Sequence, residues 1–71
     1  MTVVVKQHTG NSYYVSMSIE RRHGNEVYVV QVCPLYKDGT CGYPEREMTY
    51  SLYAKRNADA TYRRYVKNYC D

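Results

Sequence analysis

The chain has 71 residues, of which 44% are apolar and 14% aromatic, and it carries a formal net charge of +3. This length fits one small domain and argues against a multi-step enzyme with its own cofactor pocket. The mean hydropathy of -0.71, without a long apolar run, excludes a membrane-spanning helix, and the aromatic and β-branched content excludes a disordered tail.

The predicted elements begin with a short Val-rich run at residues 2–6, which either adds an edge strand or frays. A polar turn at residues 8–12 follows it. Residues 13–22 then alternate between apolar and polar side chains, which is the period of a half-buried strand. The apolar face of this strand carries Tyr13, Val15, Met17 and Ile19.

The segment His23-Gly24-Asn25 supplies the positive φ angles that a tight hairpin needs. Residues 26–33 are rich in β-branched side chains and form the second predicted strand, with Pro34 at its end because proline cannot donate to the ladder. We expect Tyr28, Val30 and Val32 to face the core, since Gln31 then points outward.

The third predicted strand extends to residue 55, after turn residues between Lys37 and Pro44. The period then changes from two to that of a helix over residues 57–70, with Asn57 as the expected N-cap. One stripe of this helix is apolar and must be buried on the sheet. Its members are Ala58, Tyr62, Tyr65, Val66 and Tyr69.

The sequence therefore predicts a single α+β domain over residues 1–71. Its sheet, at residues 13–55, is a three-stranded antiparallel meander, and one C-terminal helix packs on one face. Residues 1–12 contain the short Val-rich segment and a turn, and this segment either forms a fourth strand at the edge of the sheet or frays.

All ten aromatic residues are tyrosines. A buried Tyr must pair its hydroxyl or keep it at the rim of the core, so we expect a thin core with solvated edges. The alternative is a Tyr-rich recognition surface, because Tyr is favoured at interfaces.

The three cysteines are Cys33, Cys41 and Cys70. This odd number, with no visible export signal, predicts reduced thiols and a cytoplasmic location. A disulfide between Cys33 and Cys41 stays open, because these residues flank one turn-rich stretch. We expect no metal site, since zinc needs four ligands and usually close Cys pairs.

No catalytic constellation is evident. His8 and His23 lie beside turns that contain glycine, and neither has a carboxylate or nucleophile in register with it. We therefore expect a non-enzymatic module without a cofactor, a small-molecule substrate or a membrane partner.

A strand that leads directly into a helix, here the run from Met48 to Ala60, resembles the arm-binding N-terminal domain of mobile-element integrases. The resemblance covers residues 13–69 as a pattern of elements. It implies an AP2-like βββα fold whose sheet enters the major groove of DNA. It also implies six candidate nucleic-acid-binding residues, namely Tyr14, Arg21, Arg22, Tyr53, Lys55 and Arg56.

The alternative is a protein-interaction or self-associating module that uses the Tyr-rich sheet face or a free edge strand. A Val27–Val29 pair on the open face would form an apolar patch of the kind that marks a binding site. Basic residues of the helix, Arg56, Arg63, Arg64 and Lys67, are interpreted as a solvated face. DNA is the leading expected partner by a narrow margin over protein.

Overall fold

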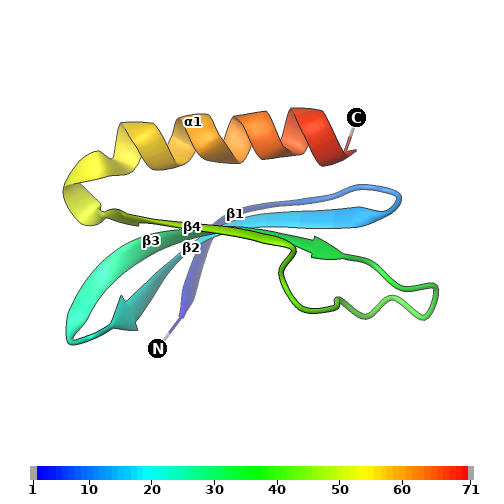
Figure 1. The fold of residues 1–71 in the computed structure, drawn as a ribbon, viewed down its shortest axis with the longest axis horizontal. Coiled ribbons are helices and arrows are strands. Elements are labelled where there is room, and N and C mark those ends of the chain that lie inside the picture. Colours follow the sequence, from blue (N-terminus) through cyan, green and yellow to red (C-terminus); the bar gives the residue numbers. More distant parts are fainter. Residues whose placement is uncertain (1, 71) are drawn as a thin grey trace.

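The computed structural model describes residues 2–70 and shows one sheet covered on one face by a helix (Figure 1). The four strands are antiparallel and lie in chain order. This confirms the α+β class with a C-terminal helix, and the N-terminal segment does add a fourth edge strand. The elements are β1 (Val3–Thr9), β2 (Tyr13–Arg22), β3 (Asn25–Pro34), β4 (Arg46–Ser51) and α1 (Lys55–Tyr65).

The β2–β3 hairpin forms the centre of the sheet. Its ladder runs without interruption from the Tyr13–Pro34 pair to the Arg22–Asn25 pair. The two-residue loop has φ angles of 52° at His23 and 81° at Gly24. Two positive φ angles give the turn whose twist matches that of the flanking strands, so the predicted hairpin is confirmed.

The core lies between this hairpin and α1. Val15 and Met17 of β2 and Val30 and Val32 of β3 are fully buried, as is Ala58 of α1. Tyrosines surround this centre. Half-buried members of this ring are Tyr13, Tyr50, Tyr65 and Tyr69.

The turn between β1 and β2 packs closely against the end of the chain. A Cβ added at Gly10 would lie 2.9 Å from the Cβ of Cys70. Only glycine leaves room for this approach. The contact ties the β1–β2 turn to the π-helical turn Val66–Cys70 that follows α1.

The transition from sheet to helix differs from the sequence prediction. The last strand ends at Ser51 rather than at residue 55, and a 3-10 turn (Leu52–Ala54) redirects the chain onto the sheet face. The helix begins at Lys55, so Asn57 lies inside its first turn, and Ala54 caps it without a side-chain hydrogen bond. The chain uses Leu52–Ala54 to change direction, but the sequence continues to alternate through these residues as it does in a strand.

We predict that Met17→Ala lowers the free energy of unfolding by about 2–5 kcal/mol, because it opens a cavity at a fully buried position. A domain this small has only about 3–5 kcal/mol to lose, so the variant should be largely unfolded. Urea denaturation followed by circular dichroism measures the change. Met48→Ala is the matched control, because Met48 is 43% exposed, and it should cost less than about 1 kcal/mol. Equal losses in the two variants would contradict the assigned core.

Candidate functional site

The six candidate nucleic-acid residues do not share one face. Tyr14 lies at the start of β2, whereas Arg21 and Arg22 lie at its far end. Tyr53 is in the 3-10 turn, fully exposed, and Lys55 and Arg56 begin α1. The resemblance implied that Tyr14, Arg22, Tyr53 and Lys55 face the DNA groove from the sheet, but Tyr53 and Lys55 lie in the connection and the helix because β4 ends early.

Arg22 is held by acidic side chains on the sheet face opposite α1. Its Nη1 donates to Oε1 of Glu47 at 2.8 Å, and its Nη2 donates to Oε1 of Glu20 at 3.3 Å. The Nε2 of Gln31 donates to Oε2 of Glu47 at 2.6 Å. Two carboxylates therefore surround one guanidinium, and Arg22 offers little net charge to a phosphate.

The pKa values of this cluster follow its hydrogen bonds. The pKa of the Glu47 carboxyl is lowered, first by its hydrogen bond from Arg22 and then by that from Gln31. The same bond raises the pKa of Arg22. The cluster is thus a mutually stabilised group rather than a set of free ligands.

The open sheet face is also less open than the sequence suggested. Val29 pairs with Ser18 on one side and Thr49 on the other, and its side chain is fully buried although no helix covers it. We attribute this burial to the curl of β2 and β3 away from α1 (Figure 1) and to the ion-paired side chains on the same face. The expected exposed Val27–Val29 patch is therefore wrong for Val29.

Tyr14 is half-buried at the other end of this face, and its hydroxyl donates to Oε1 of Gln7. Burial is the main cause that raises its pKa, followed by the nearby thiols of Cys41 and Cys33. These two cysteines are not bonded to each other, and burial raises the pKa of the Cys33 thiol. Within residues 2–70, no group of three His, Cys, Asp or Glu side chains is placed to hold a metal ion.

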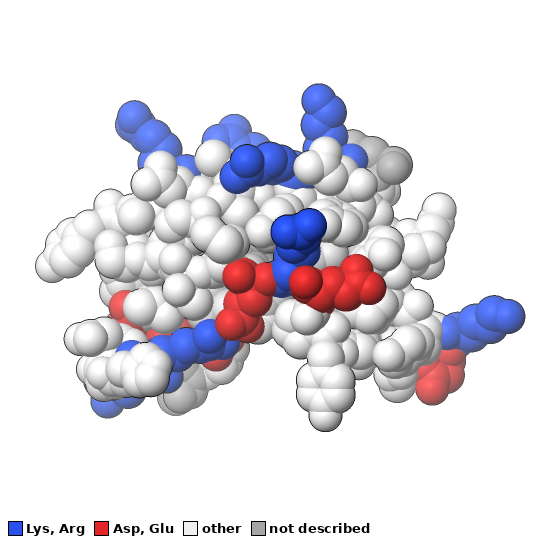
Figure 2. Space-filling model, viewed as in Figure 1, with Lys and Arg blue, Asp and Glu red and all other residues white. Residues whose placement is uncertain are grey.

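Exposed cations follow the outer side of α1, where Figure 2 shows Lys and Arg gathered along the top of the molecule. None of them forms an ion pair with another described residue. Asp59, on the same helix, is bound instead to Lys6 of β1, with Nζ 2.9 Å from Oδ1, and Lys6 is the main cause that lowers the pKa of Asp59. This surface, the basic helix face, consists of Lys55, Arg56, Arg63 and Lys67, whereas Arg64 lies beside it on the flank toward β4.

Both edge strands are exposed. All seven residues of β1 are exposed, including Val3 at 52%, Val4 at 51% and Val5 at 39%. Five of the six residues of β4 are exposed as well, and only Tyr50 is half-buried. The backbone groups on the outer side of each edge strand are therefore accessible to a further strand.

A groove of about 320 Å³ lies between β4 and the C-terminal half of α1. Arg46 at the start of β4 and Arg64 of α1 both line it. The sequence alone does not predict this pairing. The alternation of β4 places Arg46 on the same face as Met48 and Tyr50. The position of α1 beside that edge, however, is visible only in the three-dimensional structure.

No helix of the described segment is long and apolar enough to cross a membrane. Comparison with known protein families, with curated proteins and with solved structures gives no match to this chain. The geometry of its surfaces is therefore the basis for a functional proposal.

We predict that the Glu47 cluster makes stability pH-dependent. The folded pKa of Glu47 lies below its ordinary value of about 4.3, so its contribution is complete above that value and is lost as the pH falls through the folded pKa. The free energy of unfolding should decrease from about pH 5 downward, and Arg22→Ala should flatten this decrease.

Carboxyl chemical shifts give the Glu47 pKa directly. Arg22→Ala should raise it toward the ordinary value, whereas the adjacent Arg21→Ala, which removes an exposed side chain without an ion pair in residues 2–70, should not. A Glu47 pKa unchanged by Arg22→Ala would show that the ion pair does not persist in solution.

Proposed function

We propose that the chain is a non-enzymatic binding module that associates with a second copy of itself through β1. The observation that supports this most is the run of three exposed valines on an edge strand whose outer backbone is unpaired within the described chain. Long apolar edge strands pair readily with other strands, and natural proteins usually protect them with charge.

The charge that could protect β1 is directed elsewhere. Lys6 is the one Lys or Arg in this strand, and β1 contains no acidic residue. Its ammonium group pairs with Asp59 of α1 and lies 6.0 Å from the ring centre of Tyr62. Lys6 therefore points over the helix-covered face and leaves the outer edge of the strand uncharged.

Antiparallel pairing centred near Val4 would suit two identical strands. It sets Val3 of one copy opposite Val5 of the other, so that apolar side chains meet across the two-fold axis. It also keeps the two Lys6 ammonium groups apart. A small domain gains from such pairing, because its own core supplies limited stability.

We predict that Val4→Glu weakens self-association at least about tenfold, because it places two carboxylates opposite each other at the centre of the pairing. Sedimentation velocity over a range of protein concentrations measures the dimer dissociation constant. Thr9→Glu is the matched control, since Thr9 is exposed on the same strand but lies outside the paired region. A wild-type chain that stays monomeric at its highest soluble concentration would refute the proposal.

Nucleic-acid binding is the second candidate, and the basic helix face favours it over the sheet. Four cations there have no ion-pair partner in the described chain, whereas Arg22 on the sheet is held by two carboxylates. Unpaired cations can neutralise phosphates and release counterions, which is the main source of non-specific affinity. The fully exposed ring of Tyr53 lies next to this face in the chain.

We predict that, if DNA binds, the double variant Arg63→Ala/Lys67→Ala lowers affinity for random duplex DNA and reduces the salt slope of log K by about 2. Fluorescence anisotropy at several salt concentrations measures both. Arg22→Ala should leave the slope unchanged, because that side chain is already neutralised on the sheet. If the salt slope changes in Arg22→Ala but not in the double variant, DNA binds to the sheet face and not to the basic helix face.

A further inference from the structure

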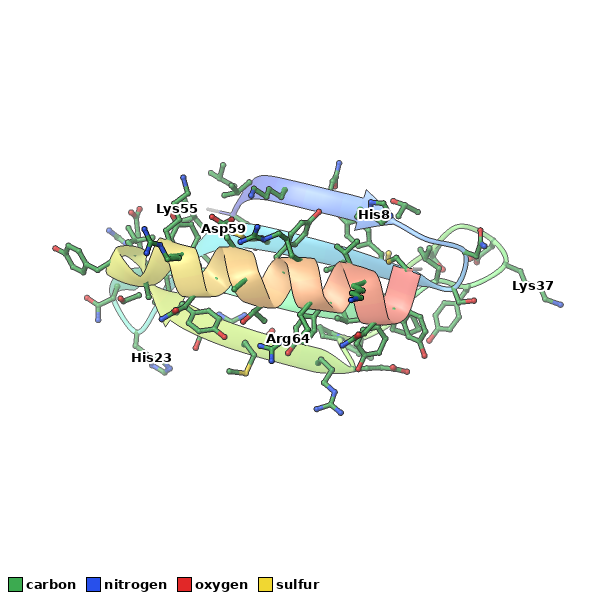
Figure 3. The ribbon with its side chains drawn as sticks, turned by 90° about the horizontal axis from the view of Figure 1, so that it is seen from above. His8, His23, Lys37, Lys55, Asp59 and Arg64 are labelled. Carbon is green, nitrogen blue, oxygen red and sulfur yellow. The ribbon has the colours of Figure 1, made fainter. Side chains whose placement is uncertain are left out.

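The groove between β4 and α1 combines an open sheet edge with a helix wall. Met48 and Tyr50 of β4 form one side, and Arg64 and Tyr69 come from the helical segment opposite. Figure 3 shows Arg64 on the side of α1 that is next to β4. The hydroxyl of Tyr50 is 2.6 Å from that of Thr61, which links strand to helix beneath the groove.

Two guanidinium groups line this groove, and neither has an acidic partner in the part of the chain that the structure describes. Arg46 donates from Nε to the hydroxyl of Tyr69 at 3.2 Å, which leaves the terminal nitrogens of its guanidinium unpaired among residues 2–70. Arg64 makes no ion pair in that range either. Among residues 2–70, the groove lining contains no Asp or Glu, although Glu45 precedes Arg46 in the chain.

The acidic residue of β4 faces away from the groove. Glu47 is bound by Arg22 and Gln31 on the opposite sheet face, so it does not neutralise Arg46. The Tyr69 hydroxyl accepts from Arg46 and keeps its own proton for another acceptor. The groove therefore offers donors and positive charge, which complement a carboxylate.

The free outer edge of β4 favours a ligand with an extended backbone. Among the described strands, β4 pairs only with β3, so an extended peptide can add along its free side by backbone hydrogen bonds. Every second side chain of such a peptide would point to the helix-covered side, into the groove. The exposed thioether side chain of Met48, two residues from Arg46, gives one of these side chains an apolar contact.

We propose that this groove binds an extended acidic segment of another protein, added as a strand to β4. An Asp or Glu of the segment lies between Arg46 and Arg64, and an apolar residue two positions along packs on Met48. The site is at the opposite edge of the sheet from β1, so it is independent of self-association. It uses Arg64 on the β4 side of α1, whereas a polyanion would use the basic helix face on the outer side.

The test uses the full chain and a fluorescent, end-blocked peptide of alternating Val and Thr with one central Glu. Fluorescence anisotropy measures its dissociation constant. Two matched peptides accompany it, one with Gln in place of Glu and one N-methylated at alternate residues so that it cannot pair with a strand. The Glu peptide should bind at least about tenfold more tightly than either, since a charge-assisted hydrogen bond or the ladder is missing in the others.

Protein variants locate the site. Arg46→Ala and Arg64→Ala should each weaken binding of the Glu peptide roughly tenfold or more, while Arg63→Ala, which alters the neighbouring exposed cation outside the groove lining, should not. Circular dichroism confirms that the variants are folded. Val4→Glu should retain peptide binding even if it abolishes self-association, so the two proposals fail separately.

Three results would overturn this proposal. The Glu peptide could fail to bind, the N-methylated peptide could bind equally well, or Arg63→Ala could weaken binding as much as Arg64→Ala. The last two outcomes would indicate attraction of an acidic chain to the basic helix face without strand addition.

Discussion

Within residues 2–70, one helix must cover four strands, and the exposure of the remaining surface depends on this difference in width. The 11 residues of α1 span about 16 Å, with a width of about 10 Å. Four strands spaced by about 4.8 Å need roughly twice that width. The helix therefore buries the centre of the sheet, where Met17 and Val30 lie, and leaves both edge strands at the surface.

The sheet face opposite α1 has no helix over it, and its central residues are buried by other means. Val29 is fully buried there without a helix above it. The strands curl, and the carboxylates of Glu20 and Glu47 converge on Arg22. Ion pairs this close to water contribute modestly to stability. Their larger effect is on the surface charge, because Glu20 and Glu47 are paired with Arg22 and leave this face nearly neutral.

The predicted and observed structures agree where a side-chain pattern has a single explanation. The alternation from Tyr13 to Arg22 and the His23-Gly24 turn each allow one backbone form, and both are present. The pattern from Leu52 to Lys55 fits a strand as well as a turn entering a helix, and there the prediction extended the strand too far. Local patterns also cannot show the burial of Val29, which depends on sheet curvature and on side chains from other strands.

The candidate site was harder to predict for a related reason. Arg46 and Arg64 meet across one groove only because β4 and α1 lie side by side, and neither residue carries a local motif. Basic residues on a helix are usually solvated, which is how Arg64 was interpreted. The sequence did indicate a free edge strand, and the structure adds which edge is apolar and which is beside guanidinium groups that form no ion pair within residues 2–70.

The two edges differ in chemistry, and this separates their proposed partners. β1 presents Val3 to Val5 and turns its Lys6 toward Asp59, so its outer side suits a strand of the same composition. β4 presents Arg46 beside Arg64 and suits an acidic segment. A domain with a small net stability is sensitive to both, because any partner that binds only the folded chain stabilises it by mass action. The proposed strand addition at either edge would extend the ladder that holds the core, and it would couple binding to folding thermodynamically.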